Sequence, residues 1–543
     1  MAGASLVIAA GLAVGGCASS QSAASCSAHP VQGSTPSTGS ASSNPAVAAG
    51  WALPGGNLQN TRDVASAIDS ADVSGLGVAW CVPLTAGAPA FGIYATTPVV
   101  VNGVVYTQDL KSNVMAISLA TGKVLWTHDY NSPNGGPDGV NVANGTVYTA
   151  TDDAAVALNA ANGTQLWSRT LVRNDHEGID STPGYNDGTV YVSTVPVNAS
   201  TAVEYGGGGQ AVLWALNAKT GVPEWSWDEV QNLWGNPGVN SGGGLWYPPS
   251  FDAQGNIYIG VANPGPLGGV PGYPWGTSRP GPNLYTDSLV KLSPAGKLLW
   301  YYQLTPHDLF DWDLQDSPLL TTANGQPVVI DGGKAGILVE LNAQTGKLIW
   351  QLPVGVHNGN DHDGLLTENA SPGSPLALPA QVTVEPGAFG GIETQLATNG
   401  STTFAAVNDL PITFKDESGP YFPSVQALES ALTSATGEMV AVNQDTGKIE
   451  WDTKLPSSPY GAATVTNNVV FTTTYSGYVY ALNAATGAIL VKIPLSAGTN
   501  APLAIDGDDV ITGASIANST SQQPLIVDYR LGAKGKLPDT VGS

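Results

Sequence analysis

ALNAANGTQLW at residues 157–167 and AVNQDTGKIEW at residues 441–451 are two copies of a motif that recurs along the chain. Each copy passes through a turn that contains a glycine and ends on a tryptophan. The sequence holds seven copies, of which four more end at Trp126, Trp225, Trp300 and Trp350, and one begins at Ala481 and closes on Val491 instead of tryptophan. A repeat of this kind decides the fold before any other signal.

The unit at residues 98–126 shows how one copy is expected to fold. Four short apolar runs are separated by tight turns, the first at Asn102-Gly103 and the last at Thr121-Gly122. Asn-Gly is the strongest two-residue hairpin signal, because both central positions need positive φ. The unit therefore predicts a four-stranded antiparallel sheet. Such sheets must stack to bury their faces, and radial stacking of four-stranded units produces a β-propeller.

The number of blades follows from the spacing of the motifs. The interval between Trp350 and Trp451 is the longest in the series and leaves room for a blade that has lost the motif. Residues 390–410, with an apolar run at 403–407, are expected to supply it. The sequence thus predicts an all-β protein, an eight-bladed β-propeller whose tryptophans dock between blades. Long stretches with a period of 3.6 residues are absent, which disfavours an α-solenoid.

The composition agrees with one large all-β domain at residues 51–543. The 543 residues include 67 Gly and 39 Pro, which suits a chain rich in turns. The net charge of -24 argues against a nucleic-acid partner, whose phosphates this surface would repel. Only 11% of the residues are charged, so uncharged polar side chains must provide much of the solvation. This pattern is compatible with an acidic medium.

The first residues of the chain predict export. Residues 4–14 are apolar but too short to span a bilayer, and they end in Val14-Gly15-Gly16-Cys17, which looks like the lipobox of a bacterial lipoprotein signal. We expect a signal peptide at residues 1–16, a lipid on Cys17, a flexible tether at residues 17–50 and an extracytoplasmic, lipid-anchored protein. No Lys or Arg precedes Arg62, so an ordinary apolar leader is the alternative.

The cysteines support export. With Cys17 lipidated, Cys26 and Cys81 remain as a candidate disulfide that would join the tether to the first blade, and two unpaired thiols are the alternative. The three cysteines form no Cys-x-x-Cys-His motif, which excludes a covalently attached c-type haem.

One segment departs from the repeat, TPHDLFDWD at residues 305–313. Its carboxylates Asp308, Asp311 and Asp313 repel one another unless they share a cation or a proton. Taken alone, a solvated acidic loop would explain the segment. However, it follows the motif that ends at Trp300, where a loop at the central channel is expected.

The segment closely resembles the signature of the quinoprotein alcohol dehydrogenases, eight-bladed propellers that use pyrroloquinoline quinone and a metal ion. The resemblance runs in order from about Trp51 to Gly532. It implies that Asp311 is the catalytic base. It also makes Asp313 similar to an extra carboxylate of the lanthanide-binding branch.

The resemblance implies the rest of a site. Metal ligands would be Glu204, Asn263, Asp311 and Asp313, whose oxygens suit Ca²⁺ or a lanthanide ion. Trp246 would be the platform on which the quinone stacks, and Lys334 would contact the quinone oxygens. Gly243 and Gly244, just before Trp246, would let a flat ring approach the backbone. Each residue also has an ordinary structural explanation, as a turn former, a core residue or a surface charge.

The activity implied is the oxidation of a small alcohol or sugar-type substrate. The metal ion would polarise a quinone carbonyl, and Asp311 would take the hydroxyl proton while hydride passes to the quinone. Electrons would leave to a separate acceptor such as a cytochrome, because this chain has no haem motif. The alternatives are a non-catalytic propeller lipoprotein that acts as a scaffold, and a sensor that binds a metal or ligand without turnover.

Several positions depart from the pattern of the family. Ala95 replaces a glutamate, Asp138 replaces an arginine that contacts the cofactor, and Ser132 and Pro133 stand near a missing cysteine pair. An aspartate for an arginine is expected to weaken binding of a tricarboxylate. His176, Glu177 and Asp180 could line this side of the site. Residues 357–363 could bind a metal, although a self-capping loop is favoured.

Overall fold

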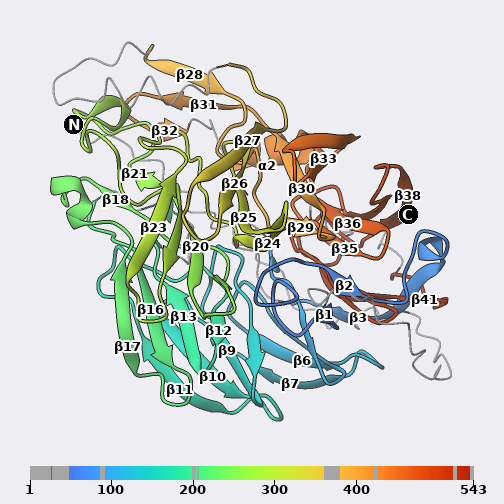
Figure 1. The fold of residues 1–543 in the computed structure, drawn as a ribbon. Helices are drawn as coiled ribbons and strands as arrows, with labels where there is room; N and C mark the ends of the chain where they lie inside the picture. Colours follow the sequence, from blue (N-terminus) through green and yellow to red (C-terminus); the bar gives the residue numbers. More distant parts are fainter. Residues whose placement is uncertain are drawn as a thin grey trace.

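Eight four-stranded antiparallel sheets form the part of the chain that the structure, a computed structural model, describes. The described residues are 26, 48–85, 92–198, 203–204, 207–359, 379–420, 425–517 and 522–538. The sheets are arranged radially as blades (Figure 1). This confirms the predicted eight-bladed β-propeller.

The first four blades follow the chain, each from its inner to its outer strand. Blade 1 contains β4 (Val99–Val101), β5 (Val104–Gln108), β6 (Val114–Ser118) and β7 (Val124–His128). Blade 2 contains β8 (Asn141–Ala143), β9 (Thr146–Ala150), β10 (Ala154–Asn159) and β11 (Gln165–Thr170). Blade 3 contains β12 (Gly184–Asn186), β13 (Thr189–Ser193), β16 (Val212–Asn217) and β17 (Pro223–Asp228). Blade 4 contains β19 (Ser250–Phe251), β20 (Ile257–Val261), β22 (Ser288–Leu292) and β23 (Leu298–Gln303).

The next three blades have the same order. Blade 5 contains β24 (Leu319–Ala323), β25 (Gln326–Gly333), β26 (Ile337–Asn342) and β27 (Leu348–Pro353). Blade 6 contains β29 (Ala397–Thr398), β30 (Thr402–Asp409), β33 (Thr436–Asn443) and β34 (Lys448–Leu455). Blade 7 contains β35 (Thr464–Thr466), β36 (Val469–Thr474), β37 (Tyr478–Asn483) and β38 (Ile489–Pro494).

Blade 8 joins strands from both halves of the chain. It contains β3 (Leu76–Pro83) beside β39 (Ala504–Asp506), β40 (Asp509–Ala514) and β41 (Leu525–Leu531), in the order β3, β41, β40, β39. The expectation that residues 390–410 supply the missing blade was therefore wrong. The apolar run at 403–407 is β30 of blade 6, and residues inserted between its strands and before them account for the long interval to Trp451.

Shorter elements lie in the connections within and between the blades. They are the pairs β1 (Ala48–Ala49) with β2 (Val64–Ala65), β14 (Val197–Asn198) with β15 (Val203–Glu204), and β18 (Ser241–Gly242) with β21 (Pro264–Gly265). The others are the sheet of β28 (Gln381–Val384), β31 (Ile412–Lys415) and β32 (Gly419–Pro420), the helix α2 (Val425–Ser434), and the 3₁₀ turns at Val73–Gly75, Asn232–Gly235 and Pro274–Gly276. No helix within the described ranges has the length and apolar character needed to cross a membrane.

Tryptophans dock each of blades 1 to 6 onto the next blade, as the repeat predicts. The Trp126 indole Nε1 donates to the Ala160 carbonyl oxygen at 3.0 Å, and the Trp126 ring packs where a Cβ on Gly163 would stand. Equivalent Nε1 to carbonyl bonds join Trp167 to Ala218, Trp225 to Pro294, Trp300 to Ala343, Trp350 to Gln444 and Trp451 to Ala484.

A further docking tryptophan was missed from the sequence. Trp80 on β3 donates to the Leu119 carbonyl oxygen at 2.7 Å and packs on Gly122, so it joins blade 8 to blade 1. In the repeat, a hairpin turn with a glycine precedes the docking tryptophan. Trp80 has no such hairpin turn before it, because its neighbouring strand β41 comes from the other end of the chain.

Cys81 on β3 forms a disulfide with Cys26, with the two Cα atoms 5.8 Å apart. The structure thus has the bonded state of the two alternatives considered for these cysteines. The predicted signal peptide and the lipidation site Cys17 lie outside the described residues, as does most of the predicted tether.

Candidate functional site

Loops at one end of the blades bring the predicted site residues together. Asp311 and Asp313 lie between β23 and β24, Lys334 lies in the turn between β25 and β26, and Asn263 follows β20. Trp246 lies between β18 and β19. These connections follow either the second or the outermost strand of a blade, which places them at the same end of the propeller.

Lys334 is the centre of the site. Its Nζ lies 2.7 Å from Asp313 Oδ2 and 3.2 Å from Asp311 Oδ2, and it stands 5.0 Å from the centroid of the Trp246 ring. Burial alone would lower the pKa of Lys334, but the charges of Asp311, Asp313 and Glu393 outweigh it and raise the pKa well above its usual value. The lysine is therefore a permanent cation between two carboxylates.

The second carboxylate of the pair is fully enclosed. The side chain of Asp313 is 0% exposed, and its Oδ1 accepts a hydrogen bond from the Asn263 backbone N at 2.6 Å. Both oxygens of Asp313 thus have partners, one from Asn263 and one from Lys334. Asp311 is more open, with 15% of its side chain exposed and a positive φ of 63°.

The third carboxylate of the acidic segment has a structural role. Asp308 accepts backbone hydrogen bonds from Phe310 N at 2.8 Å and Trp312 N at 2.9 Å, and it is buried. Phe310 and Trp312 pack in the core beneath. Successive residues of this segment therefore point in opposite directions. The aromatic rings lie in the core, and Asp311 and Asp313 lie at the site.

Glycine is required at positions 243 and 244, just before Trp246, because a side chain there would collide with residues of blade 3. Added Cβ atoms would stand 3.0 Å from Ala211 Cβ at Gly243 and 2.6 Å from Val195 Cγ1 at Gly244, and both residues have positive φ. This packing is a reason for glycine in addition to the approach of a flat ring, which the family resemblance implies. The structure adds that the segment itself is tightly packed against blade 3.

Three further acids, which were not singled out from the sequence, lie close to this cluster. Burial raises the pKa of Glu229 and of Glu393 to about 8. Burial, with Asp331 and Glu393 nearby, raises the pKa of Asp316 well above its usual value. No sequence motif marks these residues. Glu229 directly follows Asp228, Asp316 lies three residues after Asp313, and Glu393 is a single acid.

Asp138, at one of the departures from the family pattern, is also buried. It is 1% exposed, and burial followed by the charges of Asp180 and Asp109 raises its pKa well above the usual value. These effects favour the neutral acid, which can donate a hydrogen bond. The repulsion expected from an ionised Asp138 is therefore reduced. Burial likewise raises the pKa of the nearby Asp180 to about 7.

Other candidates lie apart from this cluster or outside the described part. The backbone of Glu204 is in β15, but nothing is described of its side chain. His357 contacts the carbonyl oxygens of Gly336 and Val354, while residues 360–363 are outside the described ranges. Within the described residues, no three His, Cys, Asp or Glu side chains form a group that could hold a metal ion.

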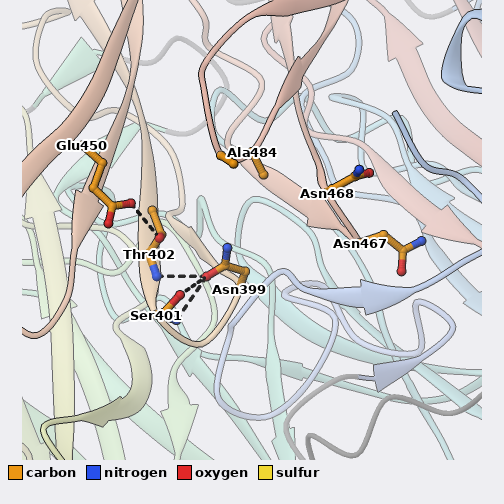
Figure 2. A pocket seen from close by; sticks show the side chains of 8 residues that line it. Asn399, Ser401, Thr402, Glu450, Asn467, Asn468 and Ala484 are labelled. Atoms are coloured by element: carbon orange, nitrogen blue, oxygen red, sulfur yellow. Dashed lines mark hydrogen bonds between the residues drawn. The ribbon is translucent and has the colours of Figure 1, made fainter. Parts of the chain in front are cut away.

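A surface pocket of about 640 Å³ lies at the opposite end of the blades (Figure 2). Its lining includes Asn399, Thr402 and Glu450, and none of the predicted site residues. Asn399 accepts hydrogen bonds from Thr402 N and from Ser401, and Thr402 donates to Glu450, as Figure 2 shows. These polar groups therefore form hydrogen bonds with one another and stabilise the turns that line the pocket.

Comparisons with known proteins agree with the β-propeller fold. A family model described as glucose/ethanol/alcohol dehydrogenase, beta-propeller domain, matches residues 51–142 and 178–388. A second model, described as outer membrane protein assembly factor BamB, matches residues 110–241 and 435–523.

Individual relatives are more distant. The chain is 28% identical to a quinohemoprotein alcohol dehydrogenase of Comamonas testosteroni, over 87% of this chain and 75% of that protein. The solved structure of quinohemoprotein alcohol dehydrogenase ADHIIG from Pseudomonas putida HK5 superposes with a TM-score of 0.77 at 21% identity, covering 91% of this chain and 82% of that one. A europium-containing methanol dehydrogenase superposes with a TM-score of 0.69 at 18% identity, covering 89% and 98%.

Proposed function

Because the chain belongs to the family of glucose/ethanol/alcohol dehydrogenase β-propeller domains, we propose that it is a quinoprotein dehydrogenase that oxidises small alcohols. Sugar-type substrates remain within this proposal. The observation that carries it is the cluster of Asp311, Asp313, Lys334 and Trp246.

At one side of the site the described residues supply part of what pyrroloquinoline quinone and a hard metal ion require, and a metal ion would need ligands beyond Asp311 and Asp313. Trp246 offers a flat aromatic face with a cation beside it, and Asp311, Asp313 and Asn263 offer carboxylate and amide oxygens, which suit Ca²⁺ or a lanthanide ion. When bound, the quinone supplies the acceptor for hydride and the metal ion supplies Lewis acidity. Asp138 and Asp180 would present carboxyl groups to the cofactor instead of positively charged side chains.

Each residue then has a defined task. Asp311, the more open carboxylate, accepts the proton of the substrate hydroxyl. Lys334 pairs with Asp311 and holds its carboxylate in position. Asp313 holds Lys334 and the Asn263 backbone in place. Trp246 orients the cofactor ring.

Location and partners complete the proposal. We place the protein outside the cytoplasm, anchored through a lipid on Cys17, with a separate electron acceptor such as a cytochrome. The disulfide between Cys26 and Cys81 supports an oxidising compartment. Nucleic acid is not a proposed partner.

A scaffold or sensor is the competing function. The second family model supports it, since its matches at residues 110–241 and 435–523 cover blade repeats. Those ranges leave out Trp246, Asn263, Asp311 and Lys334. The cluster is therefore the part of the molecule that a scaffold does not explain.

The test is reconstitution of the full chain with pyrroloquinoline quinone and either Ca²⁺ or La³⁺. Bound quinone is measured by absorbance, and turnover by alcohol-dependent dye reduction. We expect binding with at least one metal, turnover in the parent, and at least a 100-fold loss of turnover with retained quinone binding in Asp311→Ala. No quinone binding with either metal would overturn the proposal in favour of a scaffold or sensor.

Comparison of the metals tests Asp313. If Asp313 is a metal ligand, Asp313→Asn should weaken binding of La³⁺ more than binding of Ca²⁺. If it serves only Lys334 and Asn263, both metals should be affected equally.

A further inference from the structure

Glu229 lies behind the candidate site, at the end of β17, and is 0% exposed. Its Oε2 accepts a hydrogen bond from the Gly244 backbone N at 2.6 Å, and its Oε1 lies 2.5 Å from Ser193 Oγ. The backbone of Glu229 is itself fixed, because its N donates to the Ala211 oxygen and its oxygen accepts from Tyr285 N. A rigid residue therefore presents both carboxyl oxygens to the interior.

The hydrogen count at Ser193 indicates which form of Glu229 the site holds. Ser193 Oγ lies 2.8 Å from the Thr194 carbonyl oxygen as well as 2.5 Å from Glu229 Oε1. A hydroxyl carries one hydrogen, so it cannot donate to both oxygens. If Glu229 is protonated, Oε1 donates to Ser193, Ser193 donates to Thr194, and Oε2 accepts from Gly244. Every group then has a partner, as buried polar groups require.

The electrostatic surroundings agree with this count. Burial raises the pKa of Glu229 to about 8, although the hydrogen bonds from Ser193 and Gly244 oppose the shift. Asp228, the preceding residue, is the charged group whose field acts on it, and it raises the pKa further. From the other elements packed around Glu229, the contacts are the hydroxyl of Ser193, the amides of Gly244 and Tyr285, and the Ala211 carbonyl.

The segment that contains Gly243 and Gly244 links Glu229 to the candidate site through hydrogen bonds of the backbone. Gly243 N donates to the Asn263 oxygen at 3.0 Å, and Ala262 N donates to the Gly244 oxygen at 2.9 Å. Asn263 N in turn donates to Asp313. Trp246 follows Gly244 by two residues and stands beside Lys334. Glu229 is therefore joined through backbone to both sides of the cluster.

We propose that Glu229 is a positioning residue, which in its protonated form fixes the backbone at Gly243 and Gly244 and thereby the Trp246 indole beside Lys334. The inference rests on the proposed function only in that Trp246 would there be the platform for the cofactor. Ionisation of Glu229 makes Ser193 turn its hydrogen from Thr194 to Glu229 and changes the support of the glycine segment. The orientation of Trp246 is then coupled to pH.

The test reads Trp246 directly in the full chain, with no quinone, metal or alcohol added. The Trp246 signal is the difference in fluorescence emission between each protein and the same protein with Trp246→Phe, followed from pH 6 to pH 10. In the parent we expect this signal to change with a midpoint near pH 8, the value to which burial raises the pKa of Glu229.

Two variants and a matched control decide the result. Glu229→Gln reproduces the protonated acid, with an oxygen for Gly244 and an NH₂ for Ser193, so it should keep the pH 6 signal throughout. Glu229→Ala should change the signal at every pH. Glu340→Gln alters another buried acid of raised pKa, which lies in blade 5, and should keep the parent's transition.

Either of two results would overturn the inference. One is a transition near pH 8 that persists in Glu229→Gln, and the other is a parent-like signal in Glu229→Ala. If Glu229→Ala does not fold, the comparison of Glu229→Gln with the parent still decides. Because the assay contains no cofactor or substrate, a failure of the dehydrogenase proposal leaves this result unaffected.

Discussion

At the scale of single residues, the site is a balance of charge around one cation. Lys334 is 3% exposed and lies within ion-pair distance of Asp311 and Asp313. Removing one partner of a buried ion pair leaves an uncompensated charge, which costs more than the pair itself contributes. Lys334 is therefore expected to support folding as well as the chemistry of the site.

Replacement of Lys334 tests this balance. Lys334→Met should lower the free energy of unfolding at pH 7 by about 3–5 kcal/mol, because the buried carboxylate of Asp313 and the partly buried carboxylate of Asp311 lose their cation. Guanidinium unfolding followed by circular dichroism measures the loss. Lys334→Arg keeps the charge and should retain most of the stability. Equal stability of Lys334→Met and the parent would show that the carboxylates are neutral or solvated in the folded state.

The family resemblance pointed to a group of residues that the structure brings together, namely Asp311, Asp313, Asn263, Trp246 and Lys334. The sequence could not locate Glu229, since the contact with Gly244 joins positions that no spacing rule connects. It also could not show that burial favours neutral Asp138, because burial depends on the loops of neighbouring blades. Motifs indicate which residues meet, whereas their protonation depends on the packing around them.

At the scale of the blade, the contact between tryptophan and glycine is the repeated joint. Gly163 has a φ of 71°, and a Cβ there would lie 2.5 Å from the Trp126 ring. Gly145 has a similar φ of 76°, yet a Cβ there would meet nothing within 4 Å. Substitution of the two glycines can therefore separate two free-energy costs, that of backbone strain and that of displacing the tryptophan.

Alanine at these two positions should therefore have different effects. Gly145→Ala should cost about 1 kcal/mol for the positive φ. Gly163→Ala should cost a further 1–3 kcal/mol or so, because the methyl group displaces the Trp126 ring. The two losses are compared by guanidinium unfolding. Equal losses would mean that the docked tryptophan adapts without cost.

The blade scale also shows what the motif could and could not predict. Seven sheets follow from local hairpins, which the sequence reports directly. The eighth sheet pairs β3 with β41, and such a long-range contact leaves no periodic signal at either strand. The prediction that a degenerate copy of the motif forms the eighth blade therefore fell on residues 390–410, which belong to the apolar interior of blade 6.

At the scale of the whole molecule, buried acids determine how stability depends on pH. The pKa values of Asp180 and Glu340 are raised to about 7, and those of Glu229 and Glu393 to about 8, in each case first by burial. In the unfolded chain these groups titrate near pH 4. Between pH 4 and pH 8 the folded protein therefore holds more protons than the unfolded chain.

Stability should then fall as the pH rises through this range. We expect a melting temperature that is higher at pH 5 than at pH 8, as measured by differential scanning fluorimetry. A fully buried acid raised by about three pKa units contributes on the order of 4 kcal/mol to this difference. A melting temperature that rises from pH 5 to pH 8 would contradict the raised pKa values.

The disulfide is the other global feature with a measurable effect. Cys26 and Cys81 are separated by 55 residues, and a cross-link over such a loop stabilises by about 4 kcal/mol through the unfolded state. The double variant Cys26→Ser with Cys81→Ser should lose about that amount in guanidinium unfolding. The parent under reducing conditions should match the variant. No loss in either case would mean that the bond does not constrain the unfolded chain.

The pairing of β3 with β41 has a consequence for biosynthesis. A ribosome releases β3 early, but its partner strand emerges only when residues 525–531 have been made. Until then β3 must wait without its partner strand, and the ring of blades stays open at that joint. The cysteine bond needs only residues 26 and 81, so it can form during this wait and tie the early segment to the strand that will later close the ring.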